Sequence, residues 1–113
     1  MERGVKRGDI WTVSGGPDYA GKPRPVVIVQ DDRFDATDSV TACGFTSVGT
    51  ETPLARPEIA PTDDNGLRMV SWLMADKVTT VRKDKLRDRI GRLSPDDIRR
   101  LDRALIVFLG LAG

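Results

Sequence analysis

The sequence predicts an α+β protein, mostly β, in which short antiparallel strands form a small barrel or strongly curved sheet with one C-terminal α-helix packed on it. Two observations carry this prediction. Short β-branched and aromatic runs alternate with glycine and proline over most of the chain, whereas an amphipathic helical pattern appears near its end. The 113 residues suffice for one modest core, so we expect a single domain over residues 1–113.

The expected strands are short and bounded by turn-forming residues. They cover residues 9–14, 26–30, 39–46, 69–75 and 78–81, with a short edge strand near 56–59. Arg24 and Pro25 open the second strand, whose continuous β-branched run predicts burial on both faces. Segment 49–68 is polar and rich in proline, which favours loops.

The helix is expected to begin after Ser94, a good N-cap, with Pro95 at its first position, and to end near Gly110. Asp96 is expected to pair with Arg100 on its outer face. The apolar stripe consists of Ile98, Leu101, Leu105 and Phe108. Residues 105–109 are apolar all round, which predicts cover by the sheet, by a partner subunit, or by both.

Composition excludes several function classes. There is no histidine, which excludes histidine acid–base chemistry and most zinc sites, and we expect neither a metal site nor a cofactor. One cysteine excludes an internal disulfide framework, and no apolar run is long enough to span a membrane. We therefore expect a cytoplasmic protein without a membrane partner. The net charge of +1 carries no nucleic-acid signal, although residues 82–113 are locally basic.

Two aromatic residues and the cysteine have mainly structural interpretations. Trp11 and Trp72 are expected to fill the core or a dimer interface, because large aromatics on strands usually do so. Cys43 lies in the middle of an expected strand and is interpreted as a small buried apolar residue.

An ordered set of segments resembles the MazF/PemK family of toxins. These segments are Arg7-Gly8-Asp9-Ile10-Trp11, Lys22-Pro23-Arg24-Pro25-Val26-Val27-Ile28-Val29, Phe45-Thr46-Ser47, Ala75-Asp76-Lys77-Val78 and Arg89-Ile90-Gly91-Arg92-Leu93-Ser94. The resemblance implies an SH3-like barrel that forms a homodimer. It also implies a toxin of a type II toxin–antitoxin system that cleaves single-stranded mRNA sequence-selectively without a metal and is neutralised by a cognate acidic, MazE-like antitoxin.

The resemblance carries the family's active-site arginine and threonine onto Arg24 and Thr46. A guanidinium suits a phosphate at any relevant pH, and a threonine hydroxyl can position the reacting groups. Ser47 is a second candidate for the work of Thr46. Asp76 is either a general base or a carboxylate paired to Lys77 or a nearby arginine, and the sequence leaves both open.

RNA contacts are expected from side chains around this site. Tyr19 could stack on a base and Lys22 could meet a phosphate, both in the loop before the second strand. Gln30 could bond to a base edge and Lys77 could bind the backbone. A plain hairpin loop and an inert strand-end glutamine are the structural alternatives.

Two other functions remain open from the sequence. SH3-like barrels often only bind, so the chain could be a non-catalytic interaction module. The CcdB type of gyrase poison has a similar barrel, but that activity depends on a tryptophan near the C-terminal end. Here the chain ends Gly110-Leu111-Ala112-Gly113, without an aromatic residue.

Overall fold

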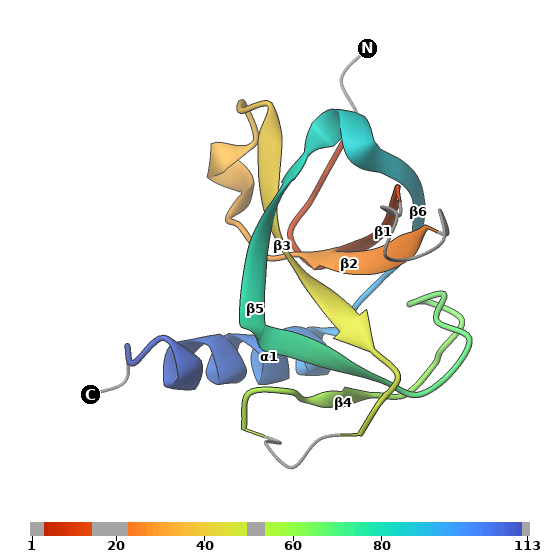
Figure 1. Ribbon diagram of the computed structural model, residues 1–113, viewed down its shortest axis with the longest axis vertical. Coiled ribbons are helices and arrows are strands. Elements are labelled where there is room, and N and C mark those ends of the chain that lie inside the picture. The colour runs from red at the N-terminus through yellow and green to blue at the C-terminus, as the bar shows by residue number, and fades with distance from the viewer. Residues whose placement is uncertain (1–3, 15–22, 50–53, 112–113) are drawn as a thin grey trace.

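The computed structural model describes residues 4–14, 23–49 and 54–111, and its centre is one strongly curled antiparallel sheet (Figure 1). The strands are β1 (Asp9–Val13), β2 (Arg24–Ile28), β3 (Ser39–Thr46), β4 (Glu58–Ile59), β5 (Ser71–Arg82) and β6 (Leu86–Arg92). Their order across the sheet is β4-β5-β3-β2-β1-β6. This half-barrel with one C-terminal helix confirms the predicted fold class.

The short 3-10 turn η2 (Asp32–Phe34) connects β2 to β3, and η3 (Lys83–Lys85) connects β5 to β6. The described elements contain no helix long and apolar enough to cross a membrane.

The two faces of the sheet bury different clusters. One face packs against the helix through residues that include Val27, Cys43 and Leu73, all fully buried. The other face curls over a second cluster that includes Trp11, Ile28 and Leu86. Alternate residues of β2 therefore enter both clusters, which confirms the prediction that this strand is buried on both sides. Trp11 and Cys43 are likewise buried as predicted.

The helix α1 (Pro95–Phe108) begins where the sequence predicts. The Ser94 side chain accepts a hydrogen bond from the Asp97 amide at 3.1 Å, so it caps the first turn. Gly110 follows the helix with φ of 72°, a left-handed conformation that glycine adopts without steric cost. Leu101 is buried beneath the sheet, and Ile98 and Leu105 pack partly against the same cluster.

Phe108, the last residue of the apolar stripe, is half exposed, because the last turn of the helix runs past the edge of the sheet (Figure 1). One prediction about α1 is wrong. Arg100 pairs with Asp97 rather than with Asp96, which pairs instead with Arg99. Both pairs have three-residue spacing, which also places side chains together on a helix surface.

Two strand predictions are wrong as well. The runs at 69–75 and 78–81 are one strand, β5, interrupted by a change of register rather than by a turn. Strand β6 was not predicted, because its sequence is charged and alternates poorly. It is held in place by its pairing with β1, which lies almost eighty residues earlier.

Candidate active site

Arg24 and Thr46 lie on the same face at the same end of the sheet. The β2–β3 ladder pairs Val26 with Gly44 and Ile28 with Ala42. Continued by two residues, the same register places Arg24 opposite Thr46. Residues directly opposite each other in an antiparallel pair point to the same side, so these two side chains share a face.

The cross-strand alignment continues past Thr46 to the edge of the sheet. Thr46 is paired with Trp72 of β5, and Trp72 is paired with Glu58 of β4. Arg24, Thr46, Trp72 and Glu58 therefore form one line across four strands, which we call the site row. Arg24 and Glu58 are exposed, and Thr46 and Trp72 are half-buried. The row is a surface that a ligand can reach at the open end of the half-barrel.

The hydroxyl of Thr46 is held by the turn that follows β3. Its oxygen accepts a hydrogen bond from the Val48 amide at 3.2 Å. The hydroxyl proton is not used by this bond, so Thr46 can still donate to a ligand oxygen. Ser47 is exposed directly after it.

Asp76 lies in an irregular part of β5 beside the site row. Cys43 pairs with Val78 but Phe45 pairs with Leu73, so residues 74–77 bulge opposite Gly44 alone. A bulge of this kind re-aims side chains that would otherwise alternate regularly. It brings Asp76 to the side chain of Arg56.

Arg56 and Asp76 form a two-pronged ion pair. Nε and Nη2 of Arg56 each donate to one carboxylate oxygen at 3.0 Å. These hydrogen bonds lower the pKa of Asp76 below its usual 3.8, despite an opposing effect of burial. The same pairing raises the pKa of Arg56. Asp76 is therefore an anion at neutral pH whose oxygens are already engaged, which favours the paired-carboxylate interpretation over the general base.

The described residues contain no group of three or more acidic or cysteine side chains arranged to hold a metal ion. The site row itself offers one carboxylate, that of Glu58. Its other side chains offer a guanidinium, a hydroxyl and an aromatic ring.

A family model for the PemK-like, MazF-like toxins of type II toxin–antitoxin systems matches residues 6–109. The chain belongs to this family. It is 57% identical over 109 residues to a probable endoribonuclease MazF of Mycolicibacterium smegmatis, covering 96% of this chain and all of that protein. Endoribonuclease MazF9 of Mycobacterium tuberculosis is 29% identical over 95% of this chain and 98% of its own.

Solved structures of MazF proteins share the fold. A mycobacterial endoribonuclease in complex with its cognate antitoxin superposes with a TM-score of 0.78 at 27% identity, covering 96% of this chain and 97% of that one. The family resemblance in the sequence is therefore confirmed, together with the fold that it implied.

The structure does not bring every predicted RNA contact of this MazF-like chain to the site row. Gln30 lies beyond the other end of β2, where its amide nitrogen donates to the Phe34 carbonyl at 3.1 Å and its oxygen accepts from the Thr41 amide at 2.9 Å. Lys77 is exposed next to Asp76 in the bulge. Tyr19 and Lys22 lie outside the described residues.

Two residues of this MazF-like chain gain importance that the sequence did not indicate. Arg56 was assigned only to a possible edge strand, and its partner Asp76 is twenty residues away. Trp72 was expected in the core or a dimer interface, but its half-buried side chain stands beside Thr46. The sequence predicted that Trp72 lies in a strand between polar segments. Its pairing with Thr46 follows only from the register between β3 and β5.

Proposed function

We propose that this chain is the toxin of a type II toxin–antitoxin system and acts as a sequence-selective endoribonuclease on single-stranded mRNA. One observation supports the proposal: the β2–β3 register, continued by two residues, places Arg24 opposite Thr46, so that the two side chains point to the same face. The names of the similar mycobacterial proteins support the activity.

The RNA supplies its own nucleophile in this mechanism. The 2′-oxygen attacks the neighbouring phosphorus, the bond from phosphorus to the 5′-oxygen breaks, and a 2′,3′-cyclic phosphate forms. The proton lost from the 2′-hydroxyl is balanced by one gained at the leaving 5′-oxygen. Arg24 stabilises the extra negative charge on the phosphate, and Thr46 orients the reacting oxygens, with Ser47 as its neighbour in the same turn.

Asp76 acts on this site through Arg56 rather than by taking the proton. A carboxylate whose pKa is lowered by two guanidinium hydrogen bonds is a weak base at neutral pH. We assign it the task of holding Arg56 in position, while Lys77 offers its charge to the RNA backbone.

Partners follow from the chemistry of the surface and from the relatives. An antitoxin partner is supported by a similar mycobacterial protein, which was solved with its cognate antitoxin. The exposed apolar end of α1 suits a homodimer. We place the enzyme in the cytoplasm, where mRNA is found and a lone cysteine stays reduced.

A binding module without catalysis and a gyrase poison are less well supported. The family match and the alignment of Arg24 with Thr46 both favour RNA cleavage. Inhibition of DNA supercoiling by the purified chain, without cleavage of RNA, would favour the gyrase poison instead.

The experiment is incubation of purified protein with a long mixed-sequence RNA, with and without EDTA, followed by mapping of the new ends. We expect cleavage that survives EDTA and leaves cyclic phosphate ends detectable by mass spectrometry. Arg24→Ala should lower the rate by about 10²-fold or more, because a charged donor to the transition state is lost. Arg82→Ala is the matched control, since Arg82 is an exposed arginine at the far end of β5.

Near-wild-type cleavage by the folded Arg24→Ala protein would remove Arg24 from the mechanism. Activity lost in EDTA and restored by magnesium would contradict the metal-independent route.

A further inference from the structure

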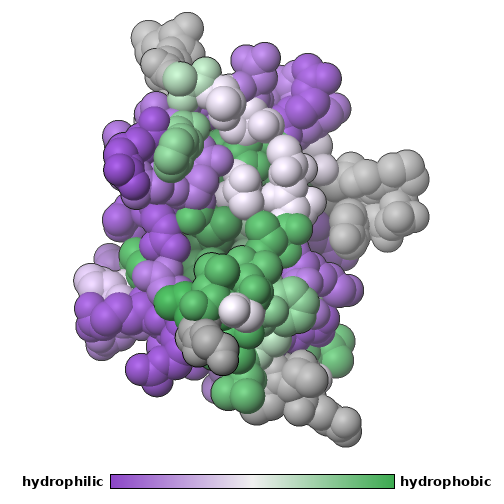
Figure 2. Space-filling model, turned by 90° about the vertical axis from the view of Figure 1, so that its left-hand side faces the viewer, coloured by the Kyte–Doolittle hydropathy of each residue, from purple (hydrophilic) through white to green (hydrophobic). Residues whose placement is uncertain are grey.

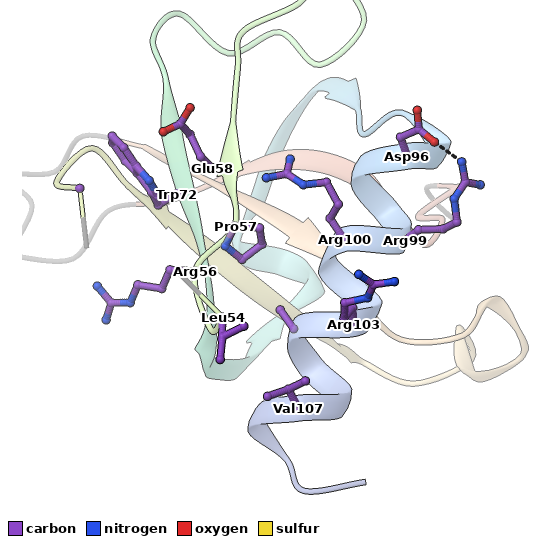
Figure 3. Close-up of a pocket in the computed structure, with 12 residues that line it drawn as sticks. Leu54, Arg56, Pro57, Glu58, Trp72, Asp96, Arg99, Arg100, Arg103 and Val107 are labelled. Carbon is purple, nitrogen blue, oxygen red and sulfur yellow. Dashed lines mark hydrogen bonds and ion pairs between the residues drawn. The ribbon is translucent and has the colours of Figure 1, made fainter. Parts of the chain in front are cut away.

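A groove runs between α1 and the edge of the sheet that carries β4 (Figure 3). Its volume is about 1080 Å³. Four arginines line it, against two acidic residues, Glu58 and Asp96. The arginines are Arg56, Arg99, Arg100 and Arg103. The lining therefore has two more basic than acidic side chains, whereas the net charge of the whole chain is +1.

Three of the arginines that line the groove come from α1, and Arg56 comes from the segment before β4. In Figure 3, Arg100 extends from α1 toward the strand that bears Glu58. Arg99 and Arg100 are each paired with an aspartate of their own helix, and Arg56 is paired with Asp76. No ion pair among the described residues involves Arg103, which is exposed. Its guanidinium is available to an anion that enters the groove.

Trp72 connects this groove with the site row. It lines the groove, and it is also the cross-strand partner of Thr46. Opposite residues in an antiparallel pair are about 5 Å apart, so a ligand on Thr46 and a ligand on Trp72 are neighbours. The groove is thus a continuation of the candidate active site rather than a separate cavity.

We propose that this groove binds the single-stranded RNA that flanks the cleavage point, with a base stacked on Trp72 and the backbone passing Arg103. A partly exposed aromatic ring beside arginines is the chemistry that proteins use to hold single strands. The inference rests on the proposed nuclease function and adds a subsite to it. An acidic peptide would also satisfy the arginines, but it would give no reason for the groove to join the site row through Trp72.

The test begins with the cleavage position mapped on a long RNA. Three oligonucleotides are then made, each non-cleavable because it carries a 2′-deoxy sugar at that position. One is short, one is extended by about six nucleotides on the 5′ side, and one is extended by about six nucleotides on the 3′ side. Binding is measured for each. For the wild-type protein, the oligonucleotide extended on one side should bind more tightly than the short one. The dissociation constant of the short oligonucleotide divided by that of the extended one measures the contribution of the groove to affinity.

Trp72→Ala should reduce this ratio by about tenfold, because one stacked base is lost. Arg103→Gln should reduce it by about threefold and should lower the salt dependence of binding to the extended RNA by about one phosphate contact. Arg82→Gln is the matched control and should leave the ratio and the salt dependence unchanged, because Arg82 lies at the other end of β5.

Two failures can be told apart. If the wild-type chain cleaves RNA and Arg24→Ala abolishes cleavage, but Trp72→Ala and Arg103→Gln both keep the wild-type ratio, the groove proposal alone is overturned. If those variants instead lose affinity only for the antitoxin, the groove is a protein site and the proposal is likewise overturned. If the wild-type chain cleaves no RNA, the proposed function itself fails.

Discussion

Asp76 has two chemically different neighbours, the guanidinium of Arg56 and the thiol of Cys43. The first lowers the pKa of the carboxyl group, and the carboxylate in turn adds to the effect of burial that raises the pKa of the thiol to about 11. The sequence left open whether Asp76 is a general base or a carboxylate paired to Lys77 or a nearby arginine. It could not identify Arg56, because the partner is set by the β4–β5 register and by a bulge that no local pattern reveals.

The ion pair between Arg56 and Asp76 should stabilise the fold in a pH-dependent way. Because the folded-state pKa of Asp76 is lowered, its contribution is present above the unfolded value near 4 and is lost as pH falls through the folded value. Asp76→Asn should cost about 1 kcal/mol at pH 7. Urea unfolding of both proteins should show this difference shrinking below about pH 4. An undiminished difference at lower pH would contradict the assignment, and Asp63→Asn in an exposed loop is the control.

Cys43 should be chemically inert in the folded protein. It is fully buried, and a thiol whose pKa is about 11, raised first by burial and then by Asp76, holds little reactive thiolate at pH 8. Iodoacetamide should label it at pH 8 only after denaturation, as followed by mass spectrometry. Labelling of the native protein at the denatured rate would show that the site opens readily.

At the scale of elements, the sequence predicted the helix and strands whose bounds are determined by neighbouring residues. The capping of α1 by Ser94 and the bounds of β3 follow from neighbouring residues, and the structure confirms both. Strand β6 was missed because nothing in its charged sequence marks it as a strand. Its place depends on distant contacts, including Gly91 against the backbone of Asp64 and Asn65.

Gly91 should tolerate no side chain. A Cβ at this position would lie 2.4 Å from the Asp64 carbonyl oxygen, and backbone atoms cannot move aside as a flexible side chain can. Gly91→Ala should therefore cost about 2–3 kcal/mol, measured by denaturant unfolding. Gly4→Ala is the matched control, since nothing lies within 4 Å of its added Cβ. If the two variants are equally stable, the backbone at Asn65 can move away from the added Cβ, and the prediction is wrong.

At the scale of the whole molecule, the half-barrel leaves one apolar area uncovered. Figure 2 shows apolar residues gathered on the side toward which α1 points. The exposed residues at that end of the chain are Ile106, Val107, Phe108, Leu109 and Leu111. The sequence predicted that this segment needs cover from the sheet or a partner. The structure shows that the sheet does not cover its last turn, which is why we propose a second copy.

A charge placed in this area should separate the proposed dimer. Phe108→Asp should convert the protein to a species near 12.4 kDa, the mass of one chain, in light scattering coupled to size exclusion. Met69→Asp, a similarly exposed apolar residue in the segment before β5, is the control and should leave the dimer intact. A wild-type protein that is already monomeric would refute the homodimer, and a Phe108→Asp protein that stays dimeric would place its interface elsewhere.

The two outermost strands of the sheet are poor templates for further strands. On one side β4 contributes only Glu58 and Ile59, and on the other β6 displays Arg87, Asp88 and Arg89 to solvent. A short or charged border discourages the edge-to-edge growth by which exposed sheets polymerise into fibrils. The borders of the sheet should accordingly not act as templates for fibril growth.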